Sequence, residues 1–187
     1  MSAGWLKVDP ATTFPVIRNR SYDRTVKRIK PLPGQESVWD YPRPPSIVGD
    51  SRRIIVEYNR EVVADSITAV KVLETSHPPV FYIPGSDIDL AYLYPTTSTS
   101  WCEFKGRADY WTVAVGDREA IDAVWGYPTP VEAYAELAGR FAFYPSKMDR
   151  CTVDGIVVES QQGDFYGGWV TPEVVGPFKG APGTRGW

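Results

Sequence analysis

The amino-acid sequence predicts an all-β fold of mainly antiparallel strands, with one short helix, an N-terminal arm and a docked aromatic C-terminal tail. Aromatic residues are frequent, with 7 Trp, 11 Tyr and 7 Phe among 187 residues, and their rings pack well on a pleated surface. The 16 Gly and 17 Pro interrupt helix interiors and mark turns. Short strand-like runs with turn residues between them follow one another from residue 54 to residue 158, which is typical of an antiparallel sheet.

The composition also divides the chain into two regions. Residues 1–35 predict a basic extended arm, because their four prolines and lack of a sustained period argue against a long helix. Residues 36–187 predict a single β-rich domain, with a Gly- and Pro-rich tail from about residue 163. We expect this tail to dock on the body, since a solvated segment has no use for its rings. The basic residues of the arm are Lys7, Arg18, Arg20, Arg24, Lys27, Arg28 and Lys30, and the rings of the tail are Phe165, Tyr166, Trp169, Phe178 and Trp187.

The first predicted elements form a hairpin. Residues 54–58 and 61–64 have strand texture around the polar link Asn59-Arg60. In residues 66–74 the apolar and polar side chains alternate less regularly, so this segment could form either a helical turn or a strand. A break at Pro78-Pro79 precedes residues 80–83, whose β-branched and aromatic content predicts a strand.

The second half of the chain continues this pattern. The sequence predicts strands over 101–105, 110–115 and 120–125, with a hairpin turn at Gly116-Asp117 between the last two. The short helix is expected over 131–137, after Pro130 and before Gly139. Further strands are predicted over 141–144 and 151–158, the second interrupted by a turn at 154–155.

The distribution of charged and apolar residues bears on the partners and the cellular compartment of the protein. Residues 1–45 hold eight Lys and Arg against four Asp and Glu, whereas the remainder holds twelve against nineteen. An acidic body gives no strong signal for nucleic-acid binding. No apolar run approaches the ~20 residues that cross a bilayer, and the N-terminus has no signal-like apolar region, so we expect a cytoplasmic protein without a membrane partner.

Residue counts argue against a metal or another cofactor. His77 is the single histidine, and Cys102 and Cys151 form no Cys-x-x-Cys motif. Cys102 with His77 could form a nucleophile and its base, but a cysteine buried for packing is the favoured interpretation.

The segment around Asp87 and Asp89 has the i, i+2 carboxylate spacing of the magnesium site in nucleotidyltransferases. In those enzymes the Gly-Ser pair lies well before the carboxylates, whereas here Gly85-Ser86 directly precedes them. No α/β alternation follows. A polar loop after a strand is therefore the favoured interpretation.

Two groups of polar residues are better candidates for a site. If residues 101–105 form a strand, Trp101, Glu103 and Lys105 share one face, where desolvation and mutual charge can shift pKa values. An exposed salt bridge is an equally good interpretation of Glu103 and Lys105. The segment before and after Pro78-Pro79 adds Glu74, Ser76, His77 and Tyr82 on a loop made rigid by proline.

Ordered motifs lie at residues 36–45, 72–84, 101–106, 110–111, 142–145, 148–149, 151–154, 165–170 and 176–180. Together these motifs resemble the domain-of-unknown-function family 427 (DUF427) from about residue 36 to the end. The family has no established activity, although a label links it to nucleotidyltransferases. A weaker resemblance to the β-tent of methionine sulfoxide reductase B and of the thalidomide-binding domain of cereblon implies a pocket walled by tryptophans, with Trp111 and Trp125 as candidates. The zinc-binding Cys-x-x-Cys pairs of those relatives are absent here, so zinc is not implied.

These observations predict a pocket for a small polar or cationic ligand, since aromatic faces attract cations and a few polar groups set orientation. The alternative is an enzyme that uses His77 or Glu103 as acid or base and Lys105 to stabilise an anion. A nucleotidyltransferase or a protein-interaction module acting through the arm and tail is less favoured. The identity of the ligand and homo-oligomer formation stay open. The expected walls are Tyr82, Trp111 and Trp125, and the expected polar contacts are Glu74, His77, Glu103 and Lys105.

Overall fold

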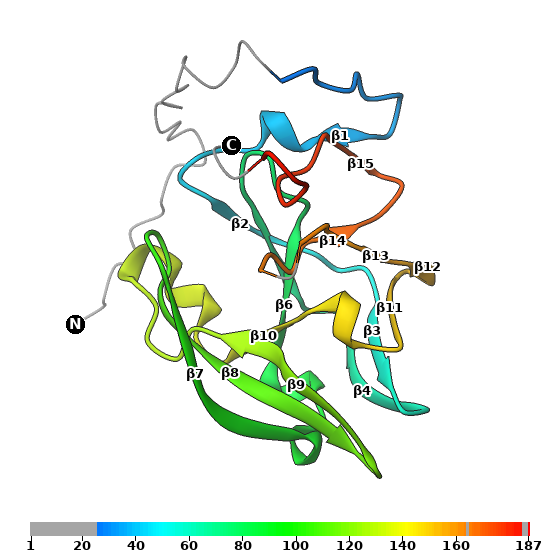
Figure 1. Cartoon of the computed structure of the whole chain (residues 1–187), viewed down its shortest axis with the longest axis vertical. Helices are drawn as coiled ribbons and strands as arrows, with labels where there is room; N and C mark the ends of the chain where they lie inside the picture. The colour runs from blue at the N-terminus through cyan, green and yellow to red at the C-terminus, as the bar shows by residue number, and fades with distance from the viewer. Residues whose placement is uncertain (1–25, 164, 185–186) are drawn as a thin grey trace, which may run out of the picture.

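A computed structural model describes residues 26–163, 165–184 and 187 and confirms an all-β fold dominated by antiparallel pairing (Figure 1). Its largest sheet has seven strands in the order β2-β5-β6-β10-β9-β8-β7, and every neighbouring pair in it is antiparallel. In that order the strands are β2 (Ser46–Gly49), β5 (Val70–Leu73), β6 (Val80–Pro84), β10 (Arg140–Phe143), β9 (Arg118–Gly126), β8 (Gly106–Val115) and β7 (Leu93–Cys102).

A second, four-stranded antiparallel sheet has the order β12-β11-β3-β4. Two short pairs complete the β structure, of which β1 with β15 is parallel and β13 with β14 is antiparallel. The strands of these three groups are β3 (Ile54–Tyr58), β4 (Glu61–Ser66), β11 (Arg150–Val153), β12 (Ile156–Val157), β1 (Glu36–Ser37), β15 (Val174–Val175), β13 (Glu159–Ser160) and β14 (Trp169–Val170).

The predicted short helix exists as a 3-10 element, η4 (Glu132–Leu137). It is kinked, because Tyr134 has φ −120° and ψ 20° inside it. The other 3-10 turns in the described part of the chain are η1 (Val38–Asp40), η2 (Gly85–Asp87), η3 (Leu90–Tyr92) and η5 (Pro145–Lys147).

The two predicted hairpin turns are confirmed. Asn59 and Arg60 join β3 to β4 with φ values of 47° and 70°, as a two-residue hairpin turn requires, and Gly116 joins β8 to β9 with φ 60°. The ambiguous segment 66–74 contains the strand β5.

The predicted strand over 101–105 is confirmed for Trp101 and Cys102 and wrong from Glu103 on. Strand β7 ends at Cys102, and residues 103–105 form the turn that leads into β8 at Gly106, whose φ is 97°. Trp, Cys and Phe have strand preference, but a backbone with positive φ at Gly106 reverses the chain here. Glu103 and Lys105 are therefore turn residues, and the face that they were expected to share with Trp101 does not exist.

The tail docks on the body, as predicted. Trp169 is 0% exposed, its ring centroid lies 5.2 Å from that of Phe81, and its Nε1 donates to the Phe143 carbonyl at 3.0 Å. Trp169 thereby joins the hydrophobic core formed with the two larger sheets. A smaller core around Val38, Trp39 and Val174 ties the start of the domain to the tail through the parallel pair of β1 and β15.

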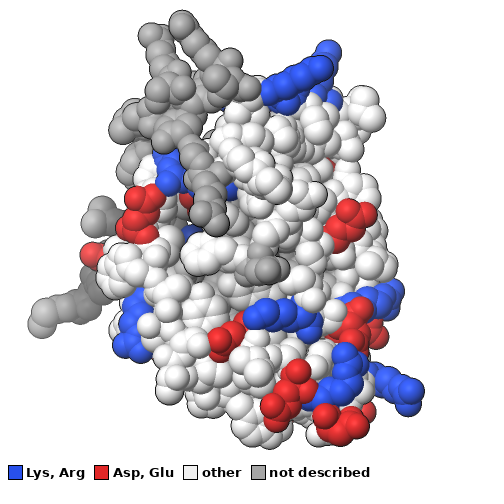
Figure 2. All heavy atoms as spheres, viewed as in Figure 1, with Lys and Arg blue, Asp and Glu red and all other residues white. Residues whose placement is uncertain are grey.

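Of the basic arm, residues 1–25 lie outside the described residues, and Arg18, Arg20 and Arg24 are among them. The next residues follow the body, since the Ile29 N–H donates to the Gly176 carbonyl at 3.2 Å. Acidic and basic side chains are interspersed on the face drawn in Figure 2, where they gather most densely toward its lower end. The ion pair of Arg118 with Asp149 joins β9 to the residue before β11. Within the described residues, no helix has the length and apolar character needed to cross a membrane.

Candidate functional site

Six of the seven residues predicted for a pocket line one cavity of about 380 Å³, which we call the main cavity. Strands β5 to β9 and the turn 103–105 form part of its wall, and the tail forms another part. The six residues are Glu74, His77, Tyr82, Glu103, Lys105 and Trp125.

Trp111, the seventh, does not line the main cavity. Its neighbour Tyr110 does, and successive side chains of a strand point to opposite faces of the sheet. Trp111 instead packs edge-on against Phe141, with ring centroids 5.0 Å apart, beside the larger hydrophobic core. The expectation that Trp111 walls the pocket is therefore corrected.

The floor of the main cavity is a cluster of rings from separate strands. The Trp125 ring lies 4.4 Å from that of Tyr144, and its Nε1 donates to the Tyr82 hydroxyl at 3.2 Å. Tyr110 shares a 2.8 Å hydrogen bond with Ser100, and Tyr127 packs 6.3 Å from Tyr82. Burial raises the pKa of Tyr82, Tyr127 and Tyr144, so these phenols stay protonated and neutral. The floor therefore offers hydroxyl groups within an apolar wall.

The rim of the main cavity carries a three-membered ion cluster centred on Arg43. Its guanidinium donates to Glu74 and to Glu103, each at 2.6 Å, and lies 5.0 Å from the ring centroid of Phe104. Arg43 thereby links the loop after β5 to the turn after β7. Both predicted carboxylates are thus already paired with a cation in this structure.

Lys105 lies deeper, with its side chain 9% exposed. Its ammonium is 4.0 Å from Glu74 Oε2 and 5.9 Å from the ring centroid of Tyr127. No acceptor in the described part of the chain comes within hydrogen-bonding distance of Nζ. Lys105 therefore directs an ammonium into the main cavity, and its one ionic neighbour among the described residues, Glu74, lies beyond hydrogen-bonding distance.

His77 faces the main cavity in a defined tautomer. Its Nδ1 lies 3.0 Å from the Thr75 carbonyl, and because a carbonyl oxygen only accepts, Nδ1 carries the proton. Burial lowers the pKa of His77, with Glu74 acting in the opposite direction, so the ring is neutral at pH 7. The Nε2 lone pair of His77 remains available, since the described residues place no donor on it.

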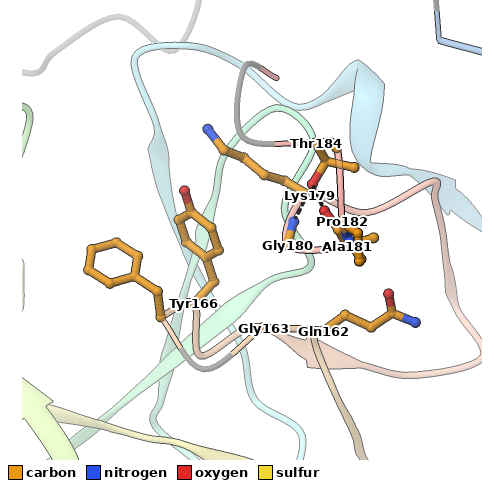
Figure 3. A pocket seen from close by; sticks show the side chains of 10 residues that line it. Gln162, Gly163, Tyr166, Lys179, Gly180, Ala181, Pro182 and Thr184 are labelled. Atoms are coloured by element: carbon orange, nitrogen blue, oxygen red, sulfur yellow. Dashed lines mark hydrogen bonds between the residues drawn. The ribbon is translucent and has the colours of Figure 1, made fainter.

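The tail supplies the remaining wall. Tyr166 meets the His77 ring edge-on with centroids 4.8 Å apart, and Lys179 Nζ lies 5.6 Å from the centroid of the Tyr166 ring. Figure 3 shows these two side chains beside a second hollow, of about 920 Å³, that the tail forms largely from its own residues. The hollow shares Phe165, Tyr166 and Lys179 with the main cavity, so the two spaces adjoin.

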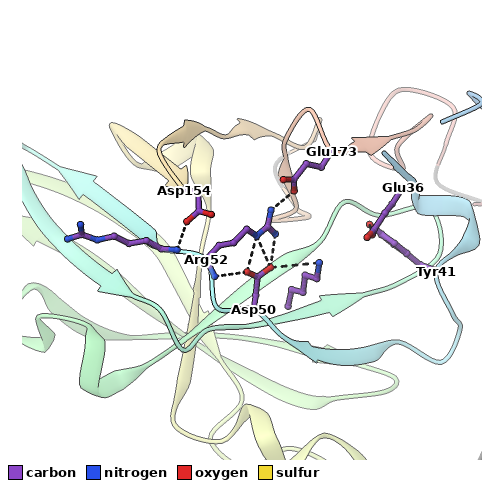
Figure 4. Close-up of polar contacts among 8 residues, drawn as sticks. Glu36, Tyr41, Asp50, Arg52, Asp154 and Glu173 are labelled. Carbon is purple, nitrogen blue, oxygen red and sulfur yellow. Dashed lines mark hydrogen bonds and ion pairs between the residues drawn. The ribbon is translucent and has the colours of Figure 1, made fainter. Parts of the chain in front are cut away.

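A separate polar network links the loop before β3 to the tail (Figure 4). Arg52 donates to both carboxylate oxygens of Asp50 and also pairs with Glu173 of the tail. Lys71 Nζ lies 3.8 Å from Asp50. The role of this network is structural, because each guanidinium and carboxylate group in it already has a partner.

The other sequence candidates have structural roles. Asp87 accepts hydrogen bonds from Ser66, Thr68 and Ser86, at 2.6, 2.9 and 3.0 Å. Asp89 caps η3 by accepting from the Ala91 N–H at 3.1 Å. No cluster of three or more His, Cys, Asp or Glu side chains suited to a metal occurs within the described ranges. Cys102 lines the main cavity, whereas Cys151 is buried in the core.

Sequence reasoning missed several residues of the main cavity. The cavity contains Arg43, Tyr110, Tyr127, Tyr144, Gln161 and Lys179 as well as the predicted residues. Arg43 lies in a Pro-rich segment that reads only as extended backbone, and the tyrosines are indistinguishable in sequence from core residues. The rings of the tail were the available signal, because they predicted that this segment docks on the body.

A comparison with models of known protein families finds a match. The family model NTP_transf_9, described as a domain of unknown function (DUF427), matches residues 46–154, more than half of the chain. The chain belongs to the DUF427 family. No curated protein matches it significantly.

The DUF427 match begins at the start of β2 and ends just after β11. It therefore contains the whole seven-stranded sheet and all of the four-stranded sheet except β12, but only part of the main cavity. Arg43 precedes the matched segment, and Gln161, Phe165, Tyr166, Gly167 and Lys179 follow it.

Proposed function

We propose that the protein binds a small polar molecule in the main cavity. The observation that carries the proposal is the convergence of residues from both ends of the chain on one space. Arg43, Trp125 and Lys179 are far apart in sequence, yet they line the same cavity. A volume of about 380 Å³ lies in the usual range for small-molecule sites, which are mostly apolar with a few placed polar groups.

The charges favour a polar ligand over the cationic one that the aromatic content first indicated. Rings alone attract cations, but the two carboxylates of the rim are held by Arg43. A cationic ligand would have to compete with this guanidinium. A neutral or anionic ligand would leave the ion cluster intact.

The proposal is tested by a thermal-shift screen against small water-soluble acids, amines and neutral metabolites. A binder should raise the melting temperature of the wild type, and the shift should shrink in Trp125→Phe and Tyr127→Phe, because both side chains line the main cavity. Trp111→Phe is the matched control, because this ring lies outside the main cavity, and it should keep the full shift. Shifts that survive in both cavity variants, or an absence of binders across the library, would overturn the proposal.

One observation favours an enzyme at the same site as the second candidate. A neutral His77 with Nδ1–H bound to Thr75 presents Nε2 as a base toward the main cavity. Glu103 is less suited to proton transfer, since its side chain is 66% exposed and paired with Arg43. NMR of each binder incubated with protein should then detect conversion that fails in His77→Gln while binding persists. An unchanged binder after prolonged incubation would argue for binding alone.

A further inference from the structure

We propose that the ligand of the main cavity carries a carboxylate, or a comparable singly charged oxyanion, which accepts hydrogen bonds from Lys105. The inference rests on the proposed function and gives its ligand a chemical class.

Lys105 presents an unpartnered ammonium to the main cavity. Its side chain is 9% exposed, and the ammonium has no hydrogen-bond acceptor among the described residues. It is not one of their fully buried polar atoms, so water in the cavity can reach it. An ammonium group has three N–H donors, and a donor that loses water without gaining an acceptor costs free energy. A ligand that fills this space must therefore supply an acceptor in place of water.

Glu74 does not supply the acceptor that the Lys105 ammonium needs. Its Oε1 accepts from Arg43 at 2.6 Å, and its Oε2 remains 4.0 Å from the Lys105 ammonium, beyond hydrogen-bonding distance. Arg43 therefore holds the carboxylate at the rim, and the space beside Lys105 is left for another oxygen.

The charges of the lining also favour an oxyanion at Lys105. Among the described residues of the main cavity, the cations are Arg43, Lys105 and Lys179, and the carboxylates are Glu74 and Glu103. Arg43 holds both carboxylates, and Lys179 Nζ donates to the Trp187 carbonyl at 2.5 Å. His77 is neutral because burial lowers its pKa. The cation left without an acceptor among the described residues is thus Lys105, and an oxyanion with one negative charge would balance it.

The rings beside Lys105 indicate the shape of the rest of the ligand. The Lys105 ammonium lies 5.9 Å from the ring centroid of Tyr127, which continues into the cluster of Tyr82, Trp125 and Tyr144. An acid bound to Lys105 would place its carbon skeleton against these rings. The expected class is therefore a small carboxylic acid with a flat or apolar body.

The test uses three probes of nearly equal shape: 4-hydroxyphenylacetate, its neutral amide 4-hydroxyphenylacetamide, and the cation tyramine. Affinities for the full chain are measured by isothermal titration calorimetry at pH 7.5. The carboxylate should bind at least about tenfold more tightly than the amide, since a charge-assisted hydrogen bond replaces a neutral one. Lys105→Met should remove that advantage, and Lys105→Arg should restore part of it.

Lys71→Met is the matched control, because Lys71 is another part-buried lysine whose ammonium lies 3.8 Å from an Asp, in a different cavity. It should leave all three affinities unchanged. Equal binding of the carboxylate and the amide, or tighter binding of tyramine, would overturn the inference while leaving the proposed function intact; water would then be the partner of Lys105. If none of the three probes binds, the acid class is refuted, and the metabolite screen decides the proposed function separately. Melting temperatures without probe establish that each variant is folded.

Discussion

Trp169 offers the most direct test of how the tail contributes to stability. Its side chain is 0% exposed and its Nε1 donates to the Phe143 carbonyl at 3.0 Å. A buried Trp removes roughly 150–250 Å² from water, which at about 25 cal/mol per Å² corresponds to about 4–6 kcal/mol. Trp→Ala changes in cores cost about 3–5 kcal/mol, and Trp169→Ala also leaves the Phe143 carbonyl without its donor. We therefore expect Trp169→Ala to lose about 4 kcal/mol of unfolding free energy.

The assay is urea unfolding followed by far-UV circular dichroism at 25 °C. Trp101→Ala is the control, because Trp101 is 75% exposed, and it should change the unfolding free energy by less than about 0.5 kcal/mol. A domain of this size shifts its melting temperature by about 2–4 °C per kcal/mol, so the two variants should also separate clearly in a thermal scan. A loss below about 1 kcal/mol in Trp169→Ala would refute the view that the tail is part of the core.

Three further predictions follow from the site. In Gly167→Ala, the added Cβ would lie 2.1 Å from the Trp125 ring, so urea unfolding should show a loss of about 1–3 kcal/mol in the free energy of unfolding. The control is Gly49→Ala, which should be close to neutral because an added Cβ there meets no atom within 4 Å. Burial lowers the pKa of His77 below its ordinary 6.5, so the unfolded chain binds that proton more readily than the folded chain does. Stability should therefore fall as the pH drops below about 6.5. In His77→Gln, the melting temperature should depend less on pH between about pH 7 and pH 5. Burial raises the pKa of Cys151, so Ellman's reagent should label one thiol in the native protein, at Cys102, and a second thiol only in denaturant; fast labelling that persists in Cys102→Ser would contradict this assignment.

Most strands could be predicted because their side chains alternate between core and surface. The pattern in β3, where Ile54, Val56 and Tyr58 are buried and the residues between them are only partly buried, is of this kind. The first part of β7 escaped prediction because its Ser- and Thr-rich residues lie at the exposed edge of the sheet and carry no apolar period. The turn at Glu103 was missed because positive φ at Gly106, rather than a Pro or Asn signal, reverses the chain.

The site was predictable only in part, for a related reason. His77 and Glu74 stand on a proline-rigid loop, and local sequence reveals such a loop. The pairing of Arg43 with Glu74 and Glu103, by contrast, joins residues 31 and 60 positions apart, and only the topology of the sheet brings them together. The error at Trp111 arose from the same source, since local pattern does not tell which face of β8 lines a cavity.

The division of the main cavity between the DUF427 segment and its flanks has a consequence for how the shape of this space can change. The sheet that carries Tyr82 and Trp125 must keep its core to fold, whereas the wall made by Phe165, Tyr166 and Lys179 belongs to a segment with little regular structure. Substitutions in that wall can reshape the space without disturbing strand pairing. On the proposal of a ligand in this cavity, exchanging residues 161–167 between two proteins that share the matched strands would then transfer ligand preference.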